Sequence, residues 1–238
     1  VGLFGKSPYR SVVVNGLVLA ENGAKMSKRL KNYPDPLEVV AKYGADALRY
    51  YLLASPVVRG EDLRFSEHGV DEVAKKVFNR LDNVLAFYLL YAGKTDLRFK
   101  IKDLSNVLDA WIVARLNHLV TETTNALNSY ELDKATRPIG DFVDDLSTWY
   151  LRRSRGRIKS DVLEEREAAL GTLRFVLSEL SKVMAPFTPF FAEYLYQQIK
   201  DLRFKIEDSD SVHLQSWPSH LPLTTYHLPL LKEMEEVR

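Results

Sequence analysis

Apolar side chains recur every three or four positions over most of this chain. The spacing runs through residues 70–89, 108–130, 139–150 and 163–184, and a shorter series follows Pro189. Residues three and four apart share one face of an α-helix, so each stretch predicts an amphipathic helix with one buried side. Connections between the stretches are short, and Pro186 separates the last two. We therefore predict a mainly α protein, in which four or five long helices form an antiparallel bundle.

The first 66 residues follow a different pattern. Residues 11–20 are rich in β-branched side chains and predict one or two short strands, with a turn near Asn15-Gly16. Asp35, Pro36 and Glu38 form a helix-start signal, and Gly44 is typical of a helix end. A second short helix is expected over residues 46–55, and a loop over 56–66. The bundle is thus predicted to follow a small α/β unit.

Composition excludes several kinds of site. The 238 residues include no cysteine, which rules out disulfides, thiolate metal sites and cysteine catalysis. The five histidines are scattered without metal-ligand spacing, so we predict no metal site. A net charge of +1 offers no global field for nucleic acid. We see no signal peptide or membrane-length apolar run, and expect a cytoplasmic protein. The apolar start without methionine suggests a piece of a longer protein.

Four further features need an interpretation of their own. Asp144-Asp145 is interpreted as a solvated acidic face, His118 as a surface or boundary residue, and residues 208–220 as an exposed loop. The aromatic cluster Phe187, Phe190, Phe191 and Tyr194 is interpreted as core.

A cationic loop, ENGAKMSKRLKNYPDP, occupies residues 21–36 after the predicted strands. Lys25 and Lys28 flank Met26-Ser27 there. Flexible ammonium groups suit a polyphosphate, whose oxygens move during reaction. Charge alone favours a solvated surface loop, because lysine-rich loops are common, and phosphate binding stays open as the alternative at this point.

A second cationic segment follows Trp149 and Tyr150. It places Arg152, Arg153, Arg155, Arg157 and Lys159 within eight residues without an acid. Arginines pair with phosphates and aromatic rings stack exposed bases, which makes this segment the best local RNA footprint. In the alternative, Trp149 continues the apolar series of Phe142 and Leu146 into the core. Some arginines would then pair with Asp144, Asp145, Glu164 or Glu165.

Several motifs together resemble the class I aminoacyl-tRNA synthetases. KMSKR (25–29), followed by YGADALR (43–49), is similar to the second signature of that family, Lys-Met-Ser-Lys-Ser, and its downstream segment. FVDDLSTWYLRRSRGR (142–157) and MAPFTPFFAEYLYQ (184–197) resemble the anticodon-binding domain of the isoleucyl members, and SVHLQSWP resembles its exit. The likeness covers nearly the whole chain. Arg29 departs from the pattern, where the family has serine.

The resemblance implies a function and its residues. Lys25 and Lys28 would be the catalytic cations that contact ATP, with Mg²⁺ as its counterion, while Met26 and Ser27 shape the loop near the adenosine. The tRNA-binding residues would be Trp149, Arg152, Arg153, Arg155 and Arg157. The parent would be a monomer that activates isoleucine with ATP and charges tRNA(Ile).

Three segments are implied: 1–60 as the end of the catalytic domain, 61–215 as the helical anticodon-binding domain and 216–238 as an exit segment. The isolated chain lacks the family's His-Ile-Gly-His signature, and we expect it not to activate isoleucine. Alternatives are a valyl-tRNA synthetase piece, a non-catalytic tRNA-binding module, and a structural fragment without a ligand.

Overall fold

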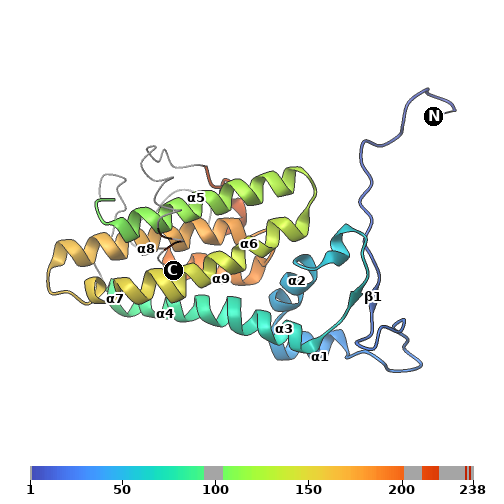
Figure 1. Cartoon of the computed structure of the whole chain (residues 1–238), viewed down its shortest axis with the longest axis horizontal. Helices are drawn as coiled ribbons and strands as arrows, with labels where there is room; N and C mark the ends of the chain where they lie inside the picture. The colour runs from blue at the N-terminus through green and yellow to red at the C-terminus, as the bar shows by residue number, and fades with distance from the viewer. Residues whose placement is uncertain (1, 94–103, 201–210, 220–233, 235, 237–238) are drawn as a thin grey trace.

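Long helices packed side by side make up most of the molecule (Figure 1). The computed structural model describes residues 2–93, 104–200, 211–219, 234 and 236. A small unit that contains the two labelled helices α1 and α2 and the strand β1 lies at one end of the bundle, and the N-terminal segment extends away from it (Figure 1). The predicted class, a helix bundle preceded by a small α/β unit, is confirmed.

The bundle consists of continuous helical rods. The first joins α3 (Glu67–Val73), η2 (Ala74–Asn79) and α4 (Arg80–Ala92), and the second is α5 (Val107–Asn128). The third joins α6 (Leu132–Asp144), η4 (Asp145–Leu151) and α7 (Arg152–Ile158), and α8 (Leu163–Met184) and α9 (Pro189–Ile199) complete the set. The segments η2 and η4 are π-helical, so each locally widens its rod and shifts the faces that follow.

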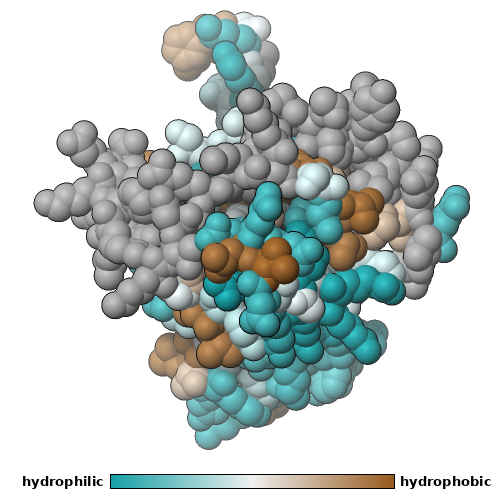
Figure 2. Space-filling view, turned by 90° about the vertical axis from the view of Figure 1, so that its left-hand side faces the viewer, coloured by the Kyte–Doolittle hydropathy of each residue, from teal (hydrophilic) through white to brown (hydrophobic). Residues whose placement is uncertain are grey.

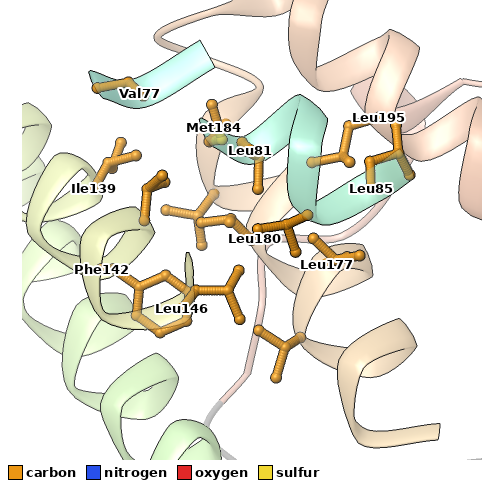
Figure 3. Packing of buried hydrophobic residues seen from close by; sticks show 14 of the residues in the cluster. Val77, Leu81, Leu85, Ile139, Phe142, Leu146, Leu177, Leu180, Met184 and Leu195 are labelled. Carbon is orange, nitrogen blue, oxygen red and sulfur yellow. The ribbon is translucent and has the colours of Figure 1, made fainter. Parts of the chain in front are cut away.

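Apolar side chains from all five rods meet in the bundle core. Figure 3 labels core residues of the first and third rods, α8 and α9. Leu81, Phe142 and Leu180 are fully buried there, as the helical spacing predicts. In the four longer series, three positions of the predicted faces are wrong: Leu89 is 43% exposed, Tyr130 is 63% exposed and Leu163, the first residue of α8, is 59% exposed. Leu89 lies beside the buried turn of Leu85, Tyr88 and Ala92, and Tyr130 lies beyond the end of α5 with a positive φ of 59°.

The aromatic cluster predicted as core is only partly buried. Phe187 is 2% exposed and Phe191 packs against the core, but Phe190 is 70% exposed and Tyr194 is 44% exposed. The buried face of α9 carries Ala192, Leu195 and Ile199 instead, because Phe190 and Tyr194 lie on the opposite side of that short helix.

Residues 211–219 form more contacts than the predicted exposed loop would. Of the predicted stretch 208–220, residues 208–210 and 220 lie outside the described residues. The 3₁₀ turn η5 (Val212–Leu214) buries Val212, which is 2% exposed. The Glu193 carboxylate accepts hydrogen bonds from the Val212 N–H and from the Ser211 hydroxyl. Trp217 donates its indole N–H to Thr124 at 2.9 Å. This segment therefore packs on α5 and α9.

The helix starts predicted for the small unit are confirmed. Helix α1 (Pro36–Tyr43) follows Asp35, whose carboxylate accepts the Leu37 N–H, and it ends at Gly44 with φ +86°. Helix α2 (Ala45–Leu53) follows at once.

The strand prediction needs correction. Only β1 (Val18–Leu19) is a strand in residues 11–20, and it pairs in parallel with β2 (Leu63–Arg64), inside the predicted loop. That loop also contains the 3₁₀ turn η1 (Pro56–Arg59). Gly16 makes no hairpin: its N–H bonds to Val57 O, and a Cβ there would come within 1.9 Å of Glu61 O. The glycine serves a close approach of two backbones.

Helix α2 ties the small unit to the bundle through backbone groups. Asp46 accepts the Phe191 N–H of α9 at 2.6 Å, and Arg49 donates to the carbonyls of Phe187 and Pro186. The Tyr50 hydroxyl donates to Thr136 O on α6 at 3.1 Å. Burial raises the pKa of Asp46, and the Phe191 hydrogen bond only partly offsets that effect.

Candidate nucleotide and RNA interfaces

The cationic loop begins with a tight reversal after β1. Ala20 donates to Ala24 O at 2.9 Å, Gly23 takes φ +82°, and the chain returns so that Lys25 bridges antiparallel to Leu19. The Asn22 side chain accepts the Ala24 N–H and closes the turn. Strand β1 thereby fixes the first residue of the predicted signature.

A single asparagine holds the rest of the signature in shape. Asn32 accepts the Ser27 N–H at 2.9 Å and donates its amide to Lys25 O at 3.1 Å. Between these two bonds, the half-buried Met26 packs against the hydrophobic core. The backbone is thus clamped on both sides of Met26-Ser27. The sequence analysis missed Asn32, because nothing in the local pattern distinguishes it from other polar loop residues.

The clamp leaves the cations of the loop outside. Lys25, Lys28 and Arg29 are exposed, and no ion pair joins them to an acid within the part of the chain that the structure describes. Three free positive charges on a held backbone are suited to a polyanion such as the phosphates of ATP.

The second predicted site lies at the far end of the molecule, where α7 ends the third rod (Figure 1). Arg152, Arg153, Arg155 and Lys159 are exposed there, with no acid in ion-pair distance among residues 2–93, 104–200 and 211–219. Figure 2 shows this end of the bundle as a mainly hydrophilic surface with small apolar patches. The four free cations form an acid-free ridge on α7.

Trp149 and Arg153 form a stacked pair beside this ridge. The indole is half-buried and packs against the core, and the Arg153 guanidinium lies 4.0 Å from its ring centroid. Thr148, Trp149, Arg152 and Arg153 line a surface hollow of about 480 Å³. The site therefore combines an aromatic platform with two cations, as the RNA interpretation requires.

Arg157 differs from the other predicted arginines because it points inward. Its guanidinium bonds both oxygens of the fully buried Asp109 of α5, at 3.0 and 2.7 Å. The buried Tyr150 hydroxyl donates to the same carboxylate at 2.8 Å. Burial raises the pKa of Tyr150, and the Asp109 charge adds to this rise. Burial lowers the pKa of Arg157, but the hydrogen bonds and charge of Asp109 outweigh it.

The acids at 144 and 145 are not a solvated face, and that interpretation is wrong. Asp145 is 1% exposed and accepts from Arg115 Nε at 2.9 Å, while Asp144 pairs with Arg80. These ion pairs join η4 to α5 and α4 to α6. His118 is exposed beside Glu122, as predicted.

Two aromatic rings of α4, Phe87 and Tyr91, also lie against the ridge. Neither residue was predicted as part of the site. Arg155 is 5.8 Å from the Phe87 ring centroid, and Lys159 is 5.8 Å from that of Tyr91. The sequence did carry a signal for these rings, as two aromatic residues four apart beside the buried series.

Among the described residues, no helix has the length and apolar content needed to cross a membrane.

Comparisons with known proteins match both parts of the chain. Residues 1–65 match the family of class I tRNA synthetases (I, L, M and V), and residues 109–238 match the anticodon-binding domain of tRNA ligase. Isoleucine–tRNA ligases are similar throughout: that of Chlamydia trachomatis serovar A is 45% identical over 99% of this chain and 23% of its own length. That of Protochlamydia amoebophila is 43% identical over 99% and 22%. The chain thus spans about a quarter of these relatives.

Two solved structures share the fold. The Agrobacterium radiobacter LeuRS in a ternary complex with tRNA and LeuAMS matches with TM-score 0.65 and 21% identity, over 91% of this chain and 24% of its own. The Mycobacterium tuberculosis methionyl-tRNA synthetase bound by methionyl-adenylate matches with TM-score 0.58 and 22% identity, over 75% and 36%.

Proposed function

Because this chain belongs to the class I tRNA synthetases and carries the anticodon-binding domain of a tRNA ligase, we propose that it is part of an isoleucine–tRNA ligase. Identity of 45% across 99% of the chain supports the isoleucyl assignment. The proposal includes ATP with its Mg²⁺ counterion, tRNA(Ile) as partner, a monomeric protein and a cytoplasmic location. Residues 1–60, 61–215 and 216–238 are the proposed catalytic end, helical anticodon-binding domain and exit segment.

The lysine loop is the proposed ATP-binding element. In adenylate formation the isoleucine carboxylate attacks the α-phosphorus of ATP and pyrophosphate leaves. Lys28 would neutralise the charge that develops on the phosphates, with Lys25 assisting. Met26 and Ser27, held by Asn32, would shape the loop beside the adenosine. The observation that carries this proposal is the absence of an acid partner for Lys25 and Lys28 within the described residues, on a clamped backbone.

The ridge on α7 is the proposed tRNA contact. Arg152, Arg153 and Arg155 would bind phosphates, and Trp149 under Arg153 would offer a stacking surface. Arg157 is assigned a positioning role in place of the RNA contact first expected, because Asp109 occupies its guanidinium.

Filter binding of tRNA(Ile) to the chain tests the RNA half of this function. Affinity should fall with salt, because each phosphate contact releases counterions, and tRNA(Val) should bind less well. Arg152→Glu with Arg153→Glu should weaken binding, while Lys75→Glu, on an exposed lysine of η2, should leave it nearly unchanged. No binding at low salt would refute the tRNA proposal. Equal affinity for both tRNAs would favour a non-specific module, and tighter binding of tRNA(Val) would favour the valyl alternative.

A chimeric enzyme tests the ATP half. Here the chain replaces the matching region of the Chlamydia trachomatis ligase, and isoleucine-dependent ATP–pyrophosphate exchange is measured. Lys28→Ala should lower kcat by about 10²-fold or more if Lys28 stabilises the transition state. Lys6→Ala, on the exposed N-terminal segment, is the matched control. An active chimera in which Lys28→Ala has no effect would refute the role of the loop.

A further inference from the structure

The end of α4 carries an aromatic pair that the proposed site does not use. Phe87 and Tyr91 are four residues apart, and their ring centroids lie 4.8 Å from each other at 45°. Both rings are half-buried, so part of each reaches solvent. Leu90 between them is 72% exposed. The solvent-facing side of this end of α4 is therefore more apolar than is usual for an exposed helix face.

Two cations of the α7 ridge border the same rings. Arg155 lies over Phe87 and Lys159 lies over Tyr91, both at 5.8 Å from the ring centroid. The two cations are four residues apart, as the rings are, so the ring pair of α4 and the cation pair lie side by side as one strip. Neither cation has an acid partner in the described ranges. These distances exceed the 4.0 Å between the Arg153 guanidinium and the Trp149 ring centroid, so the two cations lie less closely over their rings than Arg153 does.

Part of the strip faces away from the hollow at Trp149. Arg153 and Arg155 are two residues apart, which separates them by about 160° around the helix axis, whereas Arg152, which also lines the hollow, lies only about 60° from Arg155. Phe87 and Tyr91 also pack against the core, so the simpler interpretation is that both rings only close the edge of the bundle. Edge closure does not explain why the flanking cations are free of acids, whereas a polyanion with flat bases matches both chemistries.

We propose that Phe87 and Tyr91, with Arg155 and Lys159, form a second RNA-contact strip, where the rings stack unpaired bases and the cations bind the adjoining phosphates. The inference rests on the proposed tRNA binding and names a contact surface for it. It adds two residues of α4 and Lys159 to the interface. Paired RNA would gain only the phosphate contacts, because its bases are stacked on each other.

Binding to two synthetic RNAs of equal phosphate number tests the strip: a hairpin with an unpaired loop and a fully paired duplex. Phe87→Leu and Tyr91→Leu keep apolar volume but remove the rings, and Tyr9→Leu at the opposite end is the control. Each ring variant should weaken hairpin binding about fivefold or more, with an unchanged salt slope and duplex affinity within about twofold. Arg155→Gln and Lys159→Gln should each reduce the salt slope by about one, and Arg10→Gln should not.

The outcomes separate the strip from the proposed function. If the wild-type chain binds the hairpin and both ring variants bind it as tightly as Tyr9→Leu does, the strip is overturned and the tRNA-binding proposal stands. Equal weakening of hairpin and duplex also overturns it. Failure of the wild-type chain to bind either RNA at low salt overturns both. If circular dichroism shows that the leucine variants unfold, the exposed Arg155 and Lys159 variants decide, and an unchanged salt slope overturns the strip.

Discussion

Replacing Arg157 should destabilise the bundle far more than replacing its neighbours on α7. In Arg157→Ala, the Asp109 carboxylate keeps the Tyr150 hydroxyl but loses both guanidinium bonds, of 3.0 and 2.7 Å, at a site with no exposure. Removing one partner of a buried pair costs about 3–5 kcal/mol. Arg155→Ala, two residues away and exposed, should stay within about 0.5 kcal/mol of wild type.

Two milder variants divide this cost. Tyr150→Phe removes one hydrogen bond to a charged group and should cost about 1.5–3 kcal/mol. Asp109→Leu with Arg157→Met removes both charges together, so the double variant should lose less than the sum of its single changes. If the double variant loses less free energy of unfolding than the two single variants together, the uncompensated charge is the main cost.

Urea denaturation followed by circular dichroism measures each free energy of unfolding. The tRNA salt slope of Arg157→Ala provides a second readout and should equal that of wild type, because a positioning residue makes no phosphate contact. The positioning role would be refuted if Arg157→Ala unfolded within about 1 kcal/mol of wild type and lowered the salt slope by about one, as a phosphate contact would.

Three further changes test other parts of the fold. Ionising Asp46 costs stability as the pH rises from its ordinary pKa of 3.8 through its raised pKa. Asp46→Asn should thus have a higher free energy of unfolding than wild type in urea at pH 7, with the gain vanishing near pH 3.8. A lower free energy of unfolding at pH 7 would contradict this reasoning. Asn32→Ala releases the Ser27 N–H and Lys25 O, so limited proteolysis should cut the loop faster while the unfolding midpoint changes little; unchanged cleavage would refute the clamp. Gly16→Ala brings a Cβ to within 1.9 Å of Glu61 O. It should speed hydrogen exchange at the Leu63 and Phe65 amides, which bond to Leu17 O and Leu19 O, and leave exchange in α8 unaffected. Unchanged exchange would show that the two backbones separate without cost.

The long helices could be predicted because their spacing is local information. The series at 163–184 coincides with α8, and the Asp35–Gly44 signals give the bounds of α1. Strand β2 could not be predicted, because two residues show no periodicity and their pairing depends on β1, more than 40 residues earlier.

The chemistry of the candidate sites was only partly predictable for the same reason. Exposure of Lys25 and Lys28 follows from the loop, but the Asn32 clamp depends on a turn that the sequence does not announce. The inward turn of Arg157 depends on Asp109 of α5, and burial of Asp145 depends on Arg115. Charge density along one segment gives no sign of a partner on another helix, so acids and arginines were paired wrongly.

The junction between α2 and the bundle has an asymmetric chemistry. Asp46, Arg49 and Tyr50 supply side chains, and their hydrogen-bond partners on α6 and α9 and in the turn before α9 are backbone amides or carbonyls. Among the described residues, Arg137 of α6 contributes a side chain in the other direction, to the Ala54 carbonyl at the end of α2. Main-chain atoms are present whatever the residue type, so positions 136, 187 and 191 are free to vary as far as this junction is concerned. A saturation mutagenesis scan should therefore find intolerance concentrated on the α2 side, and domain grafts that retain α2 should join foreign bundles of the same backbone geometry.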